Sequence, residues 1–201
     1  MELKRPYLTT VEEAVQRQAV RELVEFERYC RDNRKWEEMK SCFTQDSVVT
    51  ISWYQGSGFG FVEASRNMAA SAPHRIYNTV VELCGSRAIA VMMTAIEIRK
   101  TYCGVACDLS SKARLVYRLE RLDEQWYITS MDCIYEKDSL IPCAPAGIYT
   151  PSGVRESYAN LSASLAADGY SIADDLPGDD RLELVHTLME KTLLWCAGGN
   201  I

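Results

Sequence analysis

The chain has very few histidines and no excess of positive charge. Only His74 and His186 occur among its 201 residues, and 22 lysines and arginines stand against 28 aspartates and glutamates, which gives a net charge of −6. Nucleic acids and anionic membrane surfaces are bound through clustered basic residues, so this balance argues against both as partners. Histidine is also the usual acid-base group near neutral pH, which narrows the search for such chemistry to two positions.

Long apolar runs and familiar ligand motifs are missing as well. No segment approaches the roughly 20 apolar residues of a membrane-spanning helix, and the N-terminus lacks the apolar centre of a signal peptide, so we expect a cytoplasmic protein with no membrane partner. The two histidines lie far apart in the sequence, and no aspartates or glutamates stand at a spacing typical of metal ligands. We therefore predict no metal site. The glycine-rich "QGSGFG" lacks the ending of a phosphate-binding loop, and we expect no nucleotide cofactor.

The eight cysteines are scattered at irregular spacings, mostly within apolar segments. This usage is typical of small buried thiols in a reduced compartment, and we interpret them as packing residues. The nearest pair, Cys103 and Cys107, has no companion pair and no histidine nearby, which argues against a zinc site. Spacing alone leaves disulfides open.

Helices come first in the pattern, followed by strands. Thr10, followed three residues later by a glutamate, is a capping-box signature, and apolar residues at spacings of three and four predict a long helix over 10–31. Shorter helices over 35–43 and 61–71 flank a predicted strand over 46–54. Four more strand-like runs with short turns between them predict sequential antiparallel hairpins over 75–83, 88–102, 106–122 and 125–137. We therefore predict an α+β fold with helices packed on one face of an antiparallel sheet.

A change in composition after residue 141 divides the chain. Residues 1–141 contain the predicted helices and sheet, whereas 142–201 begin with a linker rich in proline and glycine and continue with helical patterns over 154–167 and 180–197. The apolar faces of these two helices need a surface to cover them. We expect this extension to pack on the domain, or on a neighbouring subunit of a homodimer or trimer.

Two short motifs carry a resemblance to a known family. In "YCRDNRKWEEMKSCFTQDSVVTISW", Asp32 stands four residues before Trp36, and in "HRIYN", His74 stands four residues before Asn78. The segment 10–140 resembles the SnoaL-like members of the NTF2-like superfamily, which include scytalone-dehydratase-like lyases, dehydrochlorinases and polyketide cyclases. The resemblance implies a cone-shaped α+β barrel whose curved sheet wraps the long helix and leaves a pocket, and it implies catalytic roles for Asp32 and His74.

The chemistry of such a pair follows from its two groups. A histidine held by a carboxylate keeps one ring nitrogen free to accept a proton, and the carboxylate stabilises the imidazolium that forms. We predict that His74 and Asp32 act as such a general base. Aromatic and polar residues around the motifs predict a pocket for a hydrophobic small molecule. The candidate substrate-binding residues are Tyr29, Trp53, Tyr54, Asn78 and Tyr117.

The sequence leaves two functions open. The favoured one is a cofactor-independent lyase or isomerase, similar to dehydratases and cyclases, that uses His74 and Asp32. The alternative is a small-molecule-binding protein or a non-catalytic NTF2-like subunit, like the small subunits of ring-hydroxylating dioxygenases. Asp32 is also suited to cap the second helix, and a histidine at a strand end often bonds to backbone. The chain departs from scytalone-dehydratase-like enzymes in two ways: the strand 88–102 has no second histidine, and Trp53 replaces their strand tyrosine.

Overall fold

A computed structural model describes residues 10–68, 72–143, 155, 157, 162, 166–173, 175–178 and 180–196. The chain divides into two compact units after Cys143. In the second unit the structure describes helix α5, Leu182–Cys196, where the sequence predicts a helix over 180–197. Nearly all of the predicted linker and most of the predicted helix over 154–167 lie outside the described residues. None of the helices within the described ranges is long and apolar enough to cross a membrane.

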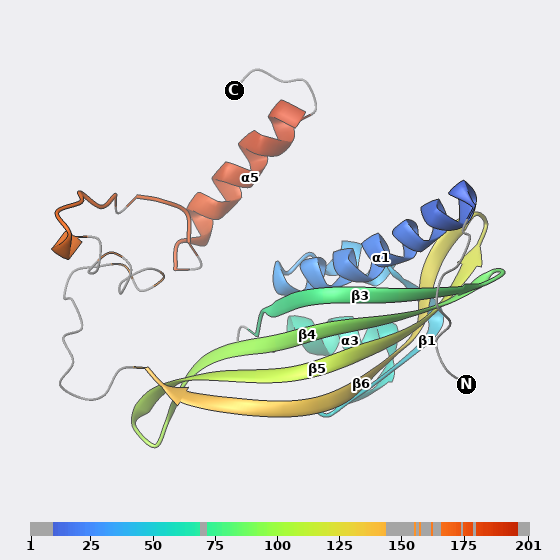
Figure 1. The fold of residues 1–201 in the computed structure, drawn as a ribbon, viewed down its shortest axis with the longest axis horizontal. Helices are drawn as coiled ribbons and strands as arrows, with labels where there is room; N and C mark the ends of the chain where they lie inside the picture. The colour runs from blue at the N-terminus through green and yellow to red at the C-terminus, as the bar shows by residue number, and fades with distance from the viewer. Residues whose placement is uncertain are drawn as a thin grey trace. The chain divides into compact units, whose positions relative to one another are not determined.

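Helix α1, Val11–Asp32, begins at the predicted capping box. The Thr10 hydroxyl accepts a hydrogen bond from the Glu13 amide (3.1 Å), and the Glu13 carboxylate accepts one from the Thr10 amide (3.0 Å). The helix lies along β3 in Figure 1, and its apolar side, including Val20, is buried. The amphipathic pattern therefore places α1 against the sheet and ends it at Asp32.

Loss of the capping box is expected to lower the free energy of unfolding by about 1 kcal/mol. Thr10→Ala removes the oxygen that accepts from the Glu13 amide, whereas Thr10→Ser keeps a hydroxyl in the same place and is expected to match the wild type. Urea denaturation of the three proteins measures the difference. Equal unfolding midpoints for the alanine and serine variants would contradict the prediction.

The segment after α1 folds into short elements. Helix α2, Trp36–Ser41, is followed by strand β1, Phe43–Ile51, which begins three residues before the predicted strand over 46–54. The glycine-rich segment contributes a second strand that the sequence did not predict, β2, Tyr54–Ser57, which pairs antiparallel with β1. Its glycines obscured the strand pattern because glycine is disfavoured within strands.

Ser57 and Gly58 fix the start of helix α3, Gly58–Arg66. The Ser57 hydroxyl accepts a hydrogen bond from the Gly60 amide (3.1 Å) and caps the helix. A Cβ atom on Gly58 would lie only 2.8 Å from the Phe43 ring, so the absence of a side chain allows α3 to approach β1 closely.

The four predicted hairpin strands form an antiparallel meander of β3 (His74–Cys84), β4 (Arg87–Tyr102), β5 (Val105–Leu122) and β6 (Gln125–Pro142). Strand β1 joins it by pairing parallel to β6, which gives the order β2-β1-β6-β5-β4-β3. Figure 1 shows the resulting curved sheet with α1 on it. The predicted α+β architecture is confirmed. The sheet itself stays open, because β2 and β3 are edge strands that do not pair with each other.

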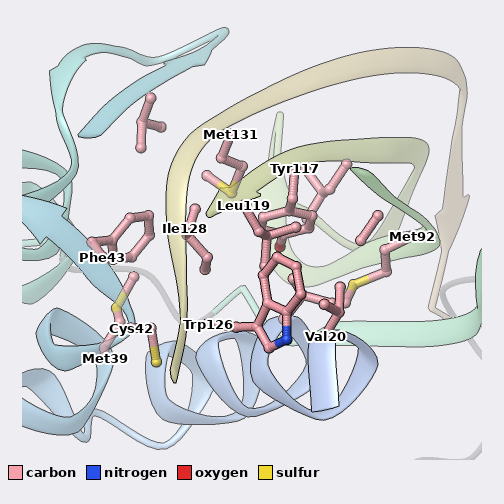
Figure 2. Packing of buried hydrophobic residues seen from close by; sticks show 14 of the residues in the cluster. Val20, Met39, Cys42, Phe43, Met92, Tyr117, Leu119, Trp126, Ile128 and Met131 are labelled. Atoms are coloured by element: carbon pink, nitrogen blue, oxygen red, sulfur yellow. The ribbon is translucent and has the colours of Figure 1, made fainter. Parts of the chain in front are cut away.

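The hydrophobic core lies between α1 and the sheet (Figure 2). Its largest fully buried side chains on β4, β5 and β6 are Met92, Tyr117, Leu119, Ile128 and Met131. At one end of the core the Trp126 indole donates a hydrogen bond to Gln16 (2.7 Å), near the start of α1. The side chain of the next residue, Arg17, donates to the carbonyl of Val81 on β3 (2.5 Å). These contacts fix α1 along the sheet, so that its last turn reaches the first residues of β3.

The cysteines only partly follow their predicted role in packing. Cys30, Cys42 and Cys107 are buried, but Cys84 and Cys103 are exposed. The interpretation of all eight as packing residues is therefore corrected. The two exposed cysteines lie at hairpin turns, where side chains point away from the core, and Cys103 has a positive φ of 49° between β4 and β5. All seven cysteines whose side chains are described are free thiols.

Candidate active site

The last residue of α1 and the first residue of β3 form a hydrogen-bonded pair. The His74 ring nitrogen Nδ1 lies 2.8 Å from Asp32 Oδ1, and the His74 backbone amide donates to Asp32 Oδ2 (2.6 Å). Because both carboxylate oxygens accept from the same residue, the position of the ring along the strand is fixed. A carboxylate on Nδ1 favours the tautomer with its proton there, which leaves Nε2 as the acceptor nitrogen.

Arg31 holds this pair in place from the same turn of α1. Its Nη1 donates to Asp32 Oδ1 (3.1 Å) and to the carbonyl of Ala72 (2.8 Å), two residues before β3 begins. The guanidinium therefore ties the end of the helix to the chain that leads into the strand. Burial lowers the pKa of Arg31.

His74 is uncharged at neutral pH. Its side chain is only 4% exposed. Burial is the main cause that lowers the pKa of the ring, the hydrogen bond to Asp32 opposes it, and the nearby charges of Arg28 and Arg31 add to it, so that the pKa falls to about 4. For Asp32, burial acts to raise the pKa, but the hydrogen bonds from His74 and the charge of Arg31 outweigh it and hold the pKa below its usual value. The site thus contains a neutral imidazole beside a carboxylate anion.

A buried ion pair adjoins the free nitrogen of this imidazole. Arg28 Nη1 lies 3.5 Å from His74 Nε2. The other side of the guanidinium is bound by Glu27: Arg28 Nε donates to Glu27 Oε2 (2.5 Å), and Nη2 donates to Oε1. The Tyr117 hydroxyl on β5 also donates to Glu27 Oε2 (3.3 Å). Polar groups therefore form one chain of contacts from Tyr117 in the core to Asp32 at the end of α1.

Glu27 and Arg28 were not predicted as site residues. They are 0% and 3% exposed, which is unusual for charged side chains. The available signal was their position three and four residues after the buried Val24, on the face of α1 that packs on the sheet. Charged residues at apolar helix positions need a partner, but the sequence does not say which one.

The predicted substrate-binding residues are distributed over several environments. Tyr117 is fully buried and contacts Glu27. Tyr29 is 44% exposed and stacks on Phe26, and Asn78 is exposed on β3. The structure thus brings Tyr117 into the chain of polar contacts that reaches His74, but it does not bring Tyr29 or Asn78 into that chain.

Trp53 and Tyr54 form an aromatic cluster with Phe61 of α3. Ring centroids of Trp53 and Tyr54 lie 5.6 and 5.7 Å from that of Phe61. Trp53 lies in the turn between β1 and β2, and Tyr54 begins β2, so the prediction that both end the first strand was wrong. The Arg28 guanidinium carbon stands 5.6 Å from the centroid of the Phe61 ring, which connects this cluster to the buried ion pair.

A small polar cavity adjoins Asp32 where the end of α1, the start of α2 and the end of α3 come together. It has a volume of about 30 Å³, and the residues that line it are Arg31, Asp32, Arg34, Trp36, Ser65, Arg66, Met68, Ala72 and Pro73. This volume suits a water molecule rather than a polycyclic ligand. Across the described parts of the chain, no three His, Cys, Asp or Glu side chains are grouped as a metal site would need.

A comparison with known protein families identifies a domain that covers the described chain from α1 into β6. A sequence model described as a SnoaL-like domain matches residues 12–132. The chain belongs to the SnoaL-like domain family. The resemblance inferred from the two spaced motifs is thereby confirmed at the level of the family, whereas the roles of the individual residues are a separate question.

Relatives of this SnoaL-like protein include two proteins of the fungus Fusarium vanettenii. Pea pathogenicity protein 2 is 28% identical over 139 residues, and the match covers 66% of this chain and 60% of that protein, so the chain spans less than two thirds of its length. A PEP2-like protein is 28% identical over 209 residues, covering 93% of this chain and 88% of the relative. Among solved structures, a hexachlorocyclohexane dehydrochlorinase, LinA type 2, has a TM-score of 0.59 at 17% identity, covering 73% of this chain and all of its own. This likeness shows an NTF2-like fold.

Proposed function

We propose that this SnoaL-like domain is a cofactor-independent lyase or isomerase in which His74 is the general base and Asp32 orients it. The observation that carries the proposal is the 2.8 Å contact between His74 Nδ1 and Asp32 Oδ1, with the ring buried. The arrangement makes Nε2 the ring nitrogen that can accept a proton, and Arg28 Nη1 lies 3.5 Å from it. We further propose that the substrate is hydrophobic, that the protein forms a homodimer or trimer, and that it is located in the cytoplasm.

The proposed reaction uses a single acid-base group. His74 Nε2 takes a proton from a carbon of the substrate, and Asp32 stabilises the imidazolium that results. In a dehydration the same imidazolium gives its proton to the departing hydroxyl, and in an isomerisation it returns the proton to another carbon. One histidine therefore serves as base and then as acid, which agrees with the lack of a second histidine on β4.

Loss of either group is expected to reduce turnover by about 10²–10⁴-fold. A suitable probe is the aldol adduct of benzaldehyde and acetone, because its dehydration gives a conjugated enone that can be followed by ultraviolet absorption. His74→Ala removes the base, and Asp32→Asn removes the charge that stabilises the imidazolium. His186→Ala changes the other histidine, on α5, and is expected to keep the wild-type rate. An unchanged rate for His74→Ala would remove the catalytic proposal.

One observation favours a second candidate without catalysis, a non-catalytic NTF2-like subunit or a small-molecule-binding protein. The cavity that adjoins Asp32 is small and polar, and the side chains of His74 and Arg28 are only 4% and 3% exposed. On this hypothesis the pair serves to hold α1 on β3. A hydrophobic ligand that raises the unfolding temperature of the wild type and of His74→Ala equally, without being converted by either protein, would support it.

A further inference from the structure

We propose that the polar cavity beside Asp32 is a binding site for a monovalent inorganic anion of about the size of chloride. The cavity lies where the end of α1, the start of α2 and the end of α3 come together, and Ala72 and Pro73, from the chain that leads into β3, also line it. The inference goes beyond the proposed function and does not depend on catalysis by His74.

Positive side chains outnumber negative ones around the cavity. Three arginines, Arg31, Arg34 and Arg66, line it together with a single carboxylate, that of Asp32. Arg66 is paired with two exposed glutamates outside this lining, at 2.8 and 3.8 Å. That leaves the charges of Arg31 and Arg34 against the one charge of Asp32, so a monovalent anion balances the lining.

Arg31 carries the buried part of this charge. Its side chain is only 9% exposed. Its Nη1 donates to Asp32 and to the Ala72 carbonyl, whereas the partner of its Nη2 is the sulfur of Met68, at 3.6 Å. A thioether sulfur is a weak acceptor, so Nη2 is a buried, charged donor that a better acceptor would satisfy. Burial and then the charge of Arg28 lower the pKa of Arg31, which agrees with a positive charge that its surroundings do not fully compensate.

The Ser65 hydroxyl is a second donor that lacks an acceptor. Ser65 lies in the last turn of α3, is 5% exposed and is one of the residues that line the cavity. Its Oγ has no hydrogen-bond partner among the described residues. A buried hydroxyl without a partner is unfavourable, and in native proteins it commonly marks the place of a bound ion or water molecule.

The acceptors near the cavity are already in use. Asp32 Oδ1 accepts from the ring of His74 and from Arg31, and Oδ2 accepts from the His74 amide. Carbonyls in the last turns of α1 and α3 accept hydrogen bonds from the turns that follow them. A cation would need acceptors and would face the arginines, and a water molecule would bring two hydrogens that need acceptors. The surplus of donors therefore selects an anion.

The size of the cavity limits which anion fits. Its volume of about 30 Å³ exceeds the roughly 10–15 Å³ that one water molecule needs, which leaves room for an ion a little larger than water but not for a bulky organic anion. Arg34 and Arg66 are exposed, so the cavity can be reached from solvent on their side. A halide has the size and the single charge that these observations require.

Quenching of tryptophan fluorescence by bromide tests the site, because Trp36 lines the cavity and bromide quenches an indole that it contacts. At constant ionic strength, set with sodium methanesulfonate because its anion is bulkier than a halide, the wild type is expected to show saturable quenching that chloride displaces. Trp36→Phe is expected to keep only the linear, collisional quenching of exposed indoles such as Trp53. Purely linear quenching of the wild type, the result for a cavity that holds water only, overturns the inference, as does saturable quenching that persists in Trp36→Phe.

A matched pair of serine variants completes the test. Ser65→Ala is expected to weaken bromide binding about tenfold or more, because a hydrogen bond to an anion is lost. Ser47→Ala makes the same change at another buried serine, 1% exposed, whose hydroxyl donates to the Thr44 carbonyl (2.6 Å), and is expected to keep the wild-type affinity. Wild-type affinity in Ser65→Ala overturns the inference.

Thermal unfolding gives a second readout that does not depend on tryptophan. The wild type is expected to unfold several degrees higher in sodium chloride than in sodium methanesulfonate of the same concentration, because chloride binds the folded state only. Ser65→Ala is expected to lose most of this difference. Equal unfolding temperatures of the wild type in the two salts overturn the inference whether or not the variant folds.

Discussion

Arg28→Ala is expected to lower the free energy of unfolding by about 3–5 kcal/mol, because it leaves a charged group buried without its partner. Glu27 is 0% exposed, and both of its oxygens accept from the guanidinium of Arg28. The Tyr117 hydroxyl alone is too weak a partner for a buried carboxylate. Chemical denaturation at neutral pH measures the loss directly.

Two controls separate burial from charge. Arg118→Ala removes a cation from the exposed pair with Asp132, whose side chains are 67% and 46% exposed, and is expected to change stability by less than about 1 kcal/mol. The double variant Glu27→Leu/Arg28→Met replaces the buried pair with apolar side chains and is expected to be close to the wild type in stability, or above it. A loss for Arg28→Ala no larger than that for Arg118→Ala would show that Glu27 does not depend on the pair.

These results bear on why the pair is present. Two charges taken out of water contribute little net stability even when they bind each other well. If the apolar double variant is at least as stable as the wild type, the fold itself does not need Glu27 and Arg28. Their position next to His74 Nε2 then supports a role in the chemistry of the site.

Local patterns in the sequence predicted most of the fold. The capping box at Thr10 and the helical spacing of apolar residues located α1, and the short turns predicted the antiparallel meander from β3 to β6. The parallel pairing of β1 with β6 was not predicted, because it joins segments far apart in the sequence and has no local signature. The open edge of the sheet depends on the same long-range arrangement.

The two residues proposed for catalysis were located by their spacing to Trp36 and Asn78. The structure places Asp32 and His74 in contact through the docking of α1 on β3, which the spacings alone did not give. The buried pair was missed because helical periodicity reports which face is buried but not which charges meet there. Exposure could not be predicted either, since Asn78 shares its strand with His74 and is nonetheless exposed.

The stability of the domain is expected to fall by about 3 kcal/mol between pH 6.5 and pH 4 because of His74 alone. The pKa of its ring is lowered to about 4 in the folded protein, from about 6.5 in an unfolded chain. Between these values the unfolded state binds the proton and the folded state does not, so acid favours unfolding. The contribution of His74 is complete above pH 6.5 and is lost once the pH has fallen through 4.

The charged groups that face His74 keep their charge over this pH range, so the loss of stability can be assigned to the histidine. Asp32 accepts from its Nδ1, and the cations Arg28 and Arg31 stay charged over the whole range. The carboxylate has a lowered pKa, so its own contribution is lost only in stronger acid, below the window of the histidine. His74→Gln is therefore expected to flatten the dependence of the unfolding free energy on pH between 6.5 and 4, relative to the wild type. Urea denaturation at several pH values measures both curves, and a curve for His74→Gln as steep as the wild type would show that another group loses its proton on folding.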